Sequence, residues 1–545
     1  MQLGSSAAIP AYWPANISRT APMLYVSPMV EALRGRPRLV FWTATLAQTL
    51  LWVLVPSLFY ASPPGDLPLV LAIGHEWQIG TVYGPPLAGW LAELAFRLFG
   101  SSVVGDYVLA QACVAAAFWA VYTLGRSIVG SSHAVLAVLL MAGISALALP
   151  TSDFGPAVLA MPLTALALMF YWRAVGEGRE RAWLALGVVL GLLALTTPFA
   201  AVLLALMIAF TLAAARGRAS LTTFYPYAAL AIMAVIALPY LFWLLAGHGG
   251  ALAVPGAPTA TAAAALAGVG IGWLRQLASV LMAHAGLAVL AIVAGAFWAD
   301  RQAAVPELLR QPVDPLAVPF VYGFALALPV TATLAAAATG RPDPLGGQGA
   351  VLLLSGLAVI VLAGDVIRLH RQAAVGWTWL ALLIGPPTLA VLSILVLPWT
   401  LASDLEVNEP SAAMGRFFTD SFNRRTGKPL AIVVGDGRLG GLVALASPQR
   451  PSLLIDASHE RAPWVTEADL REKGAIVVWP ITDPVGAPPP HLRARFPELV
   501  PEVPRAFDRP VQGRLPLMRI GWAMIRPSVA PAAPAAPAAP AAPTQ

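Results

Sequence analysis

The sequence predicts a polytopic α-helical membrane protein that ends in a small α/β domain. Of its 545 residues, 58% are hydrophobic and only 11% are charged, whereas soluble domains carry about 25% charged residues. Thirteen of the 27 acidic residues precede residue 401 and fourteen follow it. A long, acid-poor membrane domain is therefore followed by a shorter soluble one.

Apolar runs of about 17–25 residues are typical of membrane-spanning helices. The region before residue 401 contains about eleven such runs, and Pro198 divides one long run into the fifth and the sixth. The predicted spans are 39–60, 103–125, 133–150, 156–173, 182–197, 199–215, 223–246, 277–298, 315–338, 346–366 and 377–399.

Arginines set the expected orientation, because short cytoplasmic loops collect basic residues. Clusters of arginine precede the first span and follow the second, fourth, sixth, eighth and tenth. With eleven spans, every cluster falls on one side, which we take as the cytoplasm. Loop 61–102, loop 247–276 and the C-terminal domain would then face outward, and the Ala/Gly-rich stretch 249–270 is expected to be a mobile outer loop.

These patterns divide the chain into four parts. They are a cytoplasmic N-terminal segment (1–38), a transmembrane domain (39–400), an extracytoplasmic α/β domain (401–530) and a disordered Pro/Ala-rich tail (531–545). The N-terminal segment lacks the apolar core of a signal peptide. We call residues 401–530 the outer domain. In it, strands expected at 429–434, 453–455 and 475–479 alternate with helices at 438–446 and 465–473, and this alternation favours a parallel sheet.

Loop 61–102 carries the most informative residues. Helical spacing at 67–79 and 86–99 predicts two short amphipathic helices that lie in the membrane interface. Acids so close to hydrocarbon are costly and are functional candidates; Asp66, Glu76, Asp106 and Asp153 all lie on the outward side. A solvated or helix-capping role is the alternative, and Asp66 could be an N-cap.

Other ligands are not expected from the sequence. His75 lies beside Glu76, but adjacent helical residues point about 100° apart and seldom share a metal ion. The turn Gly435-Asp-Gly-Arg-Leu-Gly440 is spaced like a dinucleotide fingerprint, yet its domain is expected outside the cytoplasm, where nicotinamide cofactors are not expected. No basic run is interleaved with aromatic residues, so nucleic-acid binding is not predicted. We therefore predict neither a metal nor a cofactor.

Three runs of the loop are similar to a known family. They are Pro-Pro-Gly-Asp66, Gly74-His-Glu-Trp-Gln-Ile-Gly80 and Pro85-Pro86-Leu-Ala-Gly-Trp90-Leu. Together they resemble the bacterial family 39 glycosyltransferases of the protein-mannosyltransferase type, which are related to the aminoarabinose transferases that act on lipid A. The resemblance extends diffusely over most of residues 40–480, through Ser152-Asp-Phe154 among other runs.

The resemblance implies a GT-C membrane fold in the bacterial inner membrane. It implies an enzyme that passes a sugar from a polyprenyl-phosphate donor to a hydroxyl-bearing lipid, glycan or protein acceptor. Asp66 matches the family's acid in the first outer loop, Asp153 falls where a second acid commonly sits, and Glu76 is a third catalytic candidate. Candidates for substrate contacts are His75, Tyr83, Asp106, Arg97 and Arg275, of which the two arginines could face the leaving phosphate.

Three positions depart from the family's pattern. Leu69 replaces an acid, Gly84 a histidine or lysine, and Thr197 a lysine that relatives often carry. The sequence thus also allows a diverged or inactive member. The alternative function is a non-catalytic membrane protein, either a transporter of lipid-linked sugars or a partner in envelope assembly. Clustering of the acids at one face, and the lack of a clear internal repeat, favour the enzyme.

Overall fold

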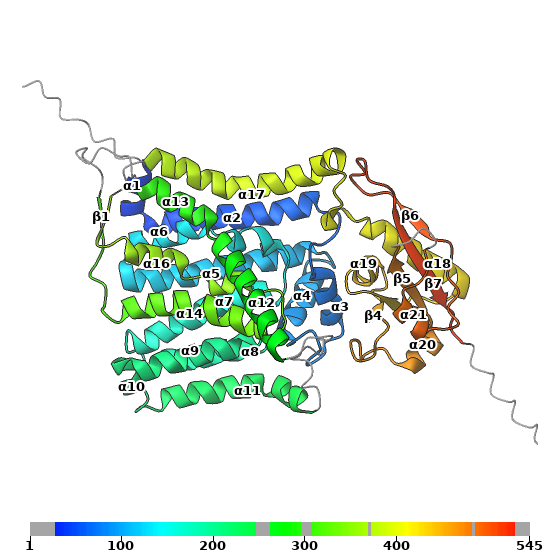
Figure 1. The fold of residues 1–545 in the computed structure, drawn as a ribbon, viewed down its shortest axis with the longest axis horizontal. Helices are drawn as coiled ribbons and strands as arrows, with labels where there is room; N and C mark the ends of the chain where they lie inside the picture. The colour runs from blue at the N-terminus through cyan, green and yellow to red at the C-terminus, as the bar shows by residue number, and fades with distance from the viewer. Residues whose placement is uncertain (1–27, 247–261, 296–306, 369–371, 482–485, 529–545) are drawn as a thin grey trace, which may run out of the picture.

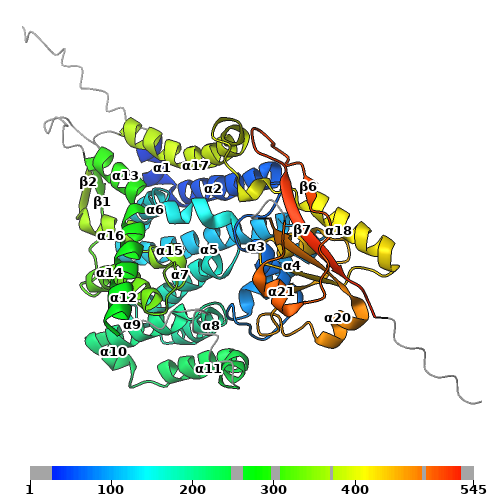
Figure 2. The ribbon, with the colours of Figure 1, turned by 45° about the vertical axis from the view of Figure 1, so that its right-hand side comes forward.

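The computed structural model describes residues 28–246, 262–295, 307–368, 372–481 and 486–528. A bundle of apolar helices forms one part of the molecule, and a sheet domain covers one end of the bundle (Figures 1 and 2). Residues 1–27 of the predicted N-terminal segment and the predicted tail at 531–545 lie outside the described residues.

Most helices of the bundle overlap the predicted spans, but the span predicted at 133–150 is α-helical only as far as Met141. The helices are α1 (Pro28–Gly35), α2 (Pro37–Phe59), α3 (Leu67–His75), α4 (Leu87–Leu98), α5 (Val104–Val129), α6 (Ser131–Met141), α7 (Pro156–Val175), α8 (Ala182–Ala194), α9 (Phe199–Ala213), α10 (Ala215–Ser220), α11 (Tyr225–Leu245), α12 (Ala262–Met282), α13 (Ala285–Gly295), α14 (Ala317–Ala338), α15 (Gly347–Val351), α16 (Ser355–Leu362) and α17 (Gln372–Thr400). Short 3₁₀ helices η1 (Ser145–Leu147) and η2 (Leu149–Ser152) precede α7, and β1 (Glu307–Leu309) pairs antiparallel with β2 (Val366–Arg368).

Among the described residues, six helices are long and apolar enough to cross a membrane: α2, α5, α7, α11, α14 and α17. The bent pair α12–α13 would make a seventh span. The remaining predicted spans coincide with shorter apolar helices, namely α6, α8, α9 and the stretch Gly347–Leu362. A polytopic helical membrane fold is therefore confirmed, while the count of eleven crossings stays a prediction.

One predicted loop is partly wrong. The described part of the stretch 249–270 is helical, because α12 already begins at Ala262 and continues to Met282. Alanine has the highest helix propensity of all residues, so an Ala-rich stretch favours helix over a mobile loop. The predicted span at 277–298 is instead divided by a bend of 41° between α12 and α13, and residues 249–261 lie outside the described part of the chain.

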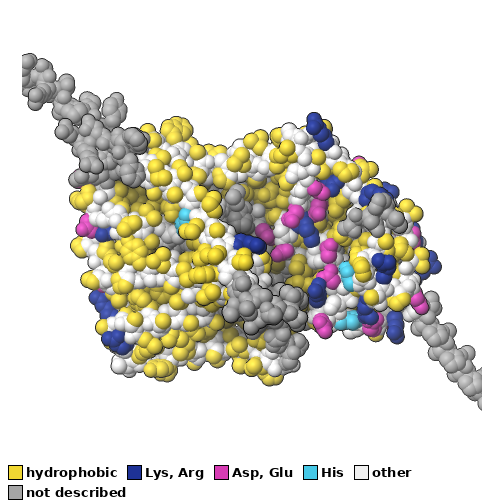
Figure 3. Space-filling view, viewed as in Figure 1, with side chains coloured by type: hydrophobic (Ala, Val, Ile, Leu, Met, Phe, Trp, Pro, Cys, Tyr) yellow, Lys and Arg dark blue, Asp and Glu magenta, His cyan; other side chains and the backbone are white. Residues whose placement is uncertain are grey.

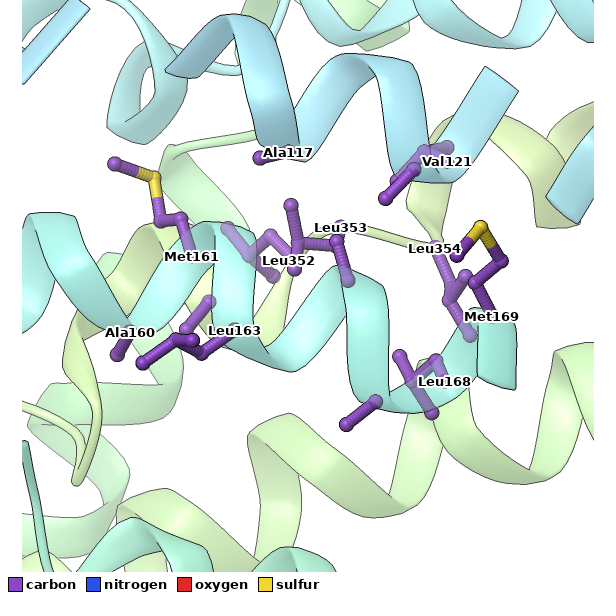
Figure 4. Packing of buried hydrophobic residues seen from close by; sticks show 14 of the residues in the cluster. Ala117, Val121, Ala160, Met161, Leu163, Leu168, Met169, Leu352, Leu353 and Leu354 are labelled. Atoms are coloured by element: carbon purple, nitrogen blue, oxygen red, sulfur yellow. The ribbon is translucent and has the colours of Figure 1, made fainter. Parts of the chain in front are cut away.

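Helix α7 forms the centre of the bundle. In α7, 83% of the most apolar 18-residue window is buried, against 17% in α11 and α17. Leu352–Leu354, between α15 and α16, pack among Ala117 and Val121 of α5 and Met161 and Met169 of α7 (Figure 4). The outer helices leave their apolar side chains exposed, and hydrophobic side chains cover the visible face of the bundle (Figure 3). Such a surface suits a hydrocarbon surrounding.

The outer domain contains a mixed five-stranded sheet. Its elements are η4 (Glu406–Asn408), α18 (Ser411–Thr426), β3 (Ile432–Gly435), α19 (Leu439–Ala446), β4 (Ser452–Ile455), α20 (Glu467–Lys473), β5 (Ala475–Pro480), α21 (Pro490–Arg495), β6 (Arg505–Phe507) and β7 (Met518–Ile525). The strand order is β4-β3-β5-β7-β6.

The predicted parallel sheet is correct for β3, β4 and β5, and it is wrong for the other two strands. β7 runs antiparallel to β5, and β6 runs antiparallel to β7. The alternation of strand and helix that predicted parallel pairing ends at β5. The chain then returns through a Pro- and Arg-rich connection without a full crossover helix, which is the connection that an antiparallel neighbour permits.

Helices α3 and α4 lie between the bundle and the outer domain (Figure 1). They are the two short helices predicted in loop 61–102. Leu69, Ala72 and Ile73 of α3 pack against the core of the outer domain, while Leu67 and Leu71 belong to the core of the bundle. The loop is therefore enclosed by protein on two sides, which positions its polar residues at a domain boundary.

Candidate functional site

Asp66 and Asp153 meet at the start of α3. Asp66 occupies the N-cap position of α3, but its side chain makes no capping hydrogen bond. The backbone N–H of Asp66 donates instead to Oδ2 of Asp153, at 3.4 Å. Asp153 thus takes over the capping role that the sequence allowed for Asp66, and the carboxylate of Asp66 is left exposed to solvent.

The loop can make this approach because residue 65 is glycine. Gly65 has φ +52°, and a Cβ at this position would lie 2.0 Å from Oδ2 of Asp153. The start of the loop is also fixed to the linker of the outer domain, since the hydroxyl of Ser62 donates to the carbonyl of Glu406 at 2.6 Å. The Pro-Pro-Gly-Asp66 run is therefore a turn that brings two acids together.

The two carboxyl groups differ in environment. Burial, followed by the negative charge of Asp66, raises the pKa of Asp153 from 3.8 to about 7. Hydrogen bonds from the backbone N–H groups of Asp66 and Leu67, and the positive charge of Arg438, oppose this rise. A carboxyl group that titrates near neutral pH can hold or release a proton under physiological conditions.

Arg438 is the basic residue beside the acid pair. It precedes α19 of the outer domain, and its Nη1 donates to the carbonyl oxygen of Gly65 at 2.8 Å. Its Nη2 donates to the carbonyl of Glu406 at 2.8 Å and to Oε2 of Glu409 at 2.7 Å. Arg438 was not predicted as a site residue, although it lies within the glycine-rich turn that is spaced like a dinucleotide fingerprint.

A second polar cluster surrounds Glu93, which is only 2% exposed. Its carboxylate lies 3.2 Å from Nδ1 of His75, 2.6 Å from Nε of Arg97 and 2.7 Å from Nη2 of Arg450. Burial opposes ionisation of Glu93, but the bonds from His75 and Arg97 and the charge of Arg450 outweigh it and lower its pKa. No local sequence pattern indicates this arrangement beyond the i,i+4 pair of Glu93 and Arg97.

Asp106 belongs to the same region. It lies in the first turn of α5 and is fully buried. Neither carboxylate oxygen has a hydrogen-bond partner in the described structure. His75, Arg97 and Asp106, predicted as substrate contacts, therefore gather around Glu93 and away from the acid pair.

Glu76 lies at the opposite end of α3 from Asp66. A helix of nine residues is about 14 Å long, so Glu76 does not join the Asp66–Asp153 pair. Burial raises the pKa of Glu76, and a hydrogen bond with Ser452 of β4 opposes this rise. The three predicted catalytic acids are thus divided between two places.

The last two predicted contacts lie apart from both clusters. Burial raises the pKa of Tyr83 to about 12, and Tyr83 is close enough to Arg461 and Asp456 of the outer domain to feel both charges. Arg275 lies exposed on α12. Its neighbour Gln276 donates from Nε2 to the carbonyl of Arg341, at 2.8 Å.

A cavity of about 260 Å³ opens beside the start of α7, three residues after Asp153. It is lined by Pro156, Ala157, Thr197, Arg341, Pro342, Asp343, Pro344, Leu345, Gly346 and Gly347. Gly347 has φ +80°, and a Cβ there would lie 2.6 Å from the Cβ of Ala157. The first turn of α7 leaves backbone N–H groups free of intrahelical acceptors, so this cavity combines a helix N-terminus with a guanidinium group.

No group of three His, Cys, Asp or Glu side chains in the described ranges is placed to hold a metal ion. The glycine-rich turn before α19 contacts α3 directly, since a Cβ on Gly437 would lie 3.2 Å from the side chain of Leu69.

Two solved structures have a similar fold. ArnT from Cupriavidus metallidurans, bound to undecaprenyl phosphate, is 12% identical with a TM-score of 0.57. The match covers 89% of this chain and 97% of that chain. The apo form of the same protein is 11% identical with a TM-score of 0.54, at the same coverage. The oligosaccharyltransferase of Archaeoglobus fulgidus is 14% identical, covers 82% of this chain and 70% of that chain, and has a TM-score of 0.39.

The fold is that of the GT-C membrane glycosyltransferases. Residues 83–243 also match the family described as dolichyl-phosphate-mannose-protein mannosyltransferase, a range that includes Asp153 but not Asp66. The predicted resemblance to this family is confirmed over the matched range, and the GT-C fold is shown by the similar structures. No curated protein sequence gives a significant match.

Proposed function

We propose that this chain moves a sugar from a polyprenyl-phosphate donor to a hydroxyl group of a lipid, glycan or protein, at the outer face of the bacterial inner membrane. The observation that carries the proposal is the pair Asp66–Asp153, which lies where the helix bundle meets the outer domain. The matched ArnT structure contains undecaprenyl phosphate, which supports a lipid-phosphate donor for this chain.

Asp66 is the general base in this proposal. Its exposed carboxylate accepts the proton of the acceptor hydroxyl while the acceptor oxygen bonds to the anomeric carbon of the sugar. The bond from that carbon to the phosphate oxygen breaks, and its electron pair leaves with the polyprenyl phosphate. The proton then passes from Asp66 to water. Asp153 holds the backbone of Asp66 and so orients the base.

Arg341 is the proposed partner of the donor phosphate. Its cavity contains Thr197, the position at which relatives often carry lysine, so the guanidinium of Arg341 supplies a cation that Thr197 cannot. Arg97, predicted for this role, is engaged by buried Glu93. Of the two α7 residues that line the cavity, Pro156 has no N–H, so Ala157 supplies the backbone donor on that side. A fixed donor of this kind stabilises a leaving phosphate.

The test is a transfer assay in membranes that contain or lack the chain, with a panel of polyprenyl-phosphate sugars and extracted envelope acceptors. We expect chain-dependent release of polyprenyl phosphate from at least one donor. Absence of donor consumption across the panel, in membranes where the folded chain is present, would contradict the proposed function.

Variants of Arg341 test the proposed donor site separately from the transfer reaction. Arg341→Gln should raise the KM for donor by about tenfold or more, since it removes a charge-assisted bond to phosphate. Arg341→Lys should restore part of the affinity. Arg526→Gln, which changes an exposed arginine at the end of β7, is the matched control. An unchanged KM in Arg341→Gln would remove Arg341 from the donor site and leave the transfer reaction standing.

A further inference from the structure

The glycine-rich turn before α19 forms the contact between the outer domain and the start of α3. A Cβ on Gly437 would lie 3.2 Å from the Leu69 side chain, and a Cβ on Gly441 would lie 3.2 Å from the Cβ of Pro68. A Cβ at either position would be in tight contact, so the neighbouring atoms would have to shift by a few tenths of an ångström. These glycines therefore permit close docking of the outer domain on the loop that carries Asp66.

The docking brings Arg438 to one particular peptide group. The carbonyl of Gly65 and the N–H of Asp66 belong to the same planar peptide unit. Arg438 donates to its oxygen at 2.8 Å, and Asp153 accepts from its nitrogen at 3.4 Å. The peptide unit is thus held from both sides, once by the outer domain and once by the helix bundle.

A peptide unit held in this way fixes the direction in which the Asp66 side chain leaves the backbone, because rotation of the peptide plane would break both bonds. The same contact explains one departure from the family's pattern. Leu69, where relatives often have an acid, packs against Gly437. In this chain, residue 69 therefore contributes to the contact between α3 and the outer domain.

We infer that Arg438 is a positioning residue for Asp66 and that the docked outer domain is a required part of the catalytic site. This inference rests on the proposed glycosyl transfer. Arg438 acts through the backbone of residues 65 and 66 and does not itself touch substrate. Its other bonds, to the carbonyl of Glu406 and the carboxylate of Glu409, hold the guanidinium in place.

The charges around the acid pair make this inference testable by pH. The charged and titratable neighbours of Asp153 are Asp66 at the start of α3, Arg438 before α19 and Tyr107 of α5. Arg438 is itself paired with Glu406 and Glu409. Arg438 lowers the pKa of Asp153. The ionised carboxylate of Asp153 accepts the N–H of Asp66 more strongly than the neutral acid does, so the base loses its position as Asp153 becomes protonated. Loss of Arg438 should therefore move the acidic limb of the pH–rate profile to higher pH, which a purely structural role would not do.

The first experiment compares Arg438→Gln, Arg438→Lys and wild type for kcat, donor KM and pH profile. We expect Arg438→Gln to lower kcat by about ten- to a hundredfold, as misplacement of a reacting group by about 1 Å does. The donor KM should stay unchanged, and Arg438→Lys should recover part of kcat and the position of the limb. Arg509→Gln, which breaks a paired arginine elsewhere in the same domain, should leave the limb in place.

Retention of wild-type kcat and pH profile in Arg438→Gln would overturn the inference. The proposed function would remain in that case, provided that wild-type membranes still transfer sugar. Loss of all transfer in wild type would instead count against the proposed function, so the two failures are distinguishable.

The second experiment does not depend on the identity of the substrate. Pro68→Cys with Gly441→Cys places two Cβ atoms 3.2 Å apart, so a small shift brings them into the range of about 3.5–4.5 Å that a disulfide needs. The single native cysteine, Cys113, is buried. We expect mild oxidation in membranes to form the crosslink, and the oxidised and reduced forms to transfer sugar at equal rates. Failure to crosslink, or transfer that requires reduction, would contradict a required docked state.

Discussion

Asp153 has two tasks that conflict electrostatically. It accepts the backbone N–H at the start of α3, which favours the ionised carboxylate, and it is largely buried beside Asp66, which favours the neutral acid. Burial is the larger effect and brings the pKa to about 7. The stability of the protein should therefore depend on pH through this one residue.

Asp153→Asn tests this dependence. Between pH 3.8 and about 7 the folded state binds more protons at Asp153 than the unfolded state does, so stability falls as pH rises through this window. We expect Asp153→Asn to gain stability relative to wild type as pH increases, and the difference to level off above about pH 7. Thermal unfolding of detergent-solubilised protein measures this stability difference at each pH. Asp420→Asn, which changes an exposed acid, is the control. A difference that stays constant from pH 4 to pH 8 would contradict the assignment.

At the scale of single residues, the sequence identified the acid pair but not its partners. Asp66 and Asp153 could be selected because acids are rare on the outward side of a membrane domain. Arg438 could not, since it lies 373 residues from Gly65 in the chain and meets it only through domain docking. Glu93 was not among the predicted site residues, because nothing in a local pattern reveals that Arg450 lies against it.

At the scale of elements, α4 is tied to the outer domain through Glu93. This carboxylate is nearly inaccessible and accepts from both α4 and the outer domain. Arg450 also lies over the ring of Phe96 at 4.4 Å. The cluster fixes the second helix of the loop in the way that Arg438 fixes the first.

Glu93→Gln should weaken this connection. Removal of one partner of a buried ion pair leaves an uncompensated charge and costs about 3–5 kcal/mol. We expect a clear loss of unfolding free energy in chemical denaturation, measured against Glu180→Gln, which changes an exposed acid. Equal stability of the two variants would show that the cluster does not hold α4 to the outer domain.

The elements that the sequence predicted best are those with a strong local period. Every apolar run overlaps an apolar helix or helix pair, although the run at 133–150 is α-helical only as far as Met141, and α3 and α4 lie where helical spacing placed them. The break between α12 and α13 was missed because His284 sits in an apolar run that continues on both sides. Its ring nitrogens lie 2.8 Å from the carbonyl of Val280 and 2.9 Å from the hydroxyl of Ser355. Strand β7 was not predicted, because its pairing with β5 depends on tertiary contacts that a local sequence pattern does not show.

At the scale of the whole molecule, charge is divided between two ends. The arginine-bearing helices α1 and α10 lie at the end of the bundle opposite the outer domain (Figure 1). Charged side chains also gather on the outer domain (Figure 3). This arrangement is what the positive-inside rule expects if the outer domain faces away from the cytoplasm.

Cysteine labelling in intact cells measures that orientation. The exposed residues Asp420 of α18 and Arg179 of the loop before α8 lie on opposite sides in the predicted topology. Asp420→Cys should react with a membrane-impermeant maleimide added from outside, and Arg179→Cys only after permeabilisation. Since the only native cysteine is buried, the background should be low. The reverse labelling pattern would contradict an outward-facing domain.

The most direct test of the central claim is the rate of sugar transfer by Asp66→Asn in membranes with matched amounts of folded chain. Asparagine keeps the shape of Asp66 but cannot accept the proton, and loss of a general base typically costs about 10²- to 10⁴-fold in rate. We predict a loss of about a hundredfold or more in kcat, with an unchanged thermal unfolding midpoint and a donor KM close to wild type. Undiminished transfer by Asp66→Asn would contradict the account.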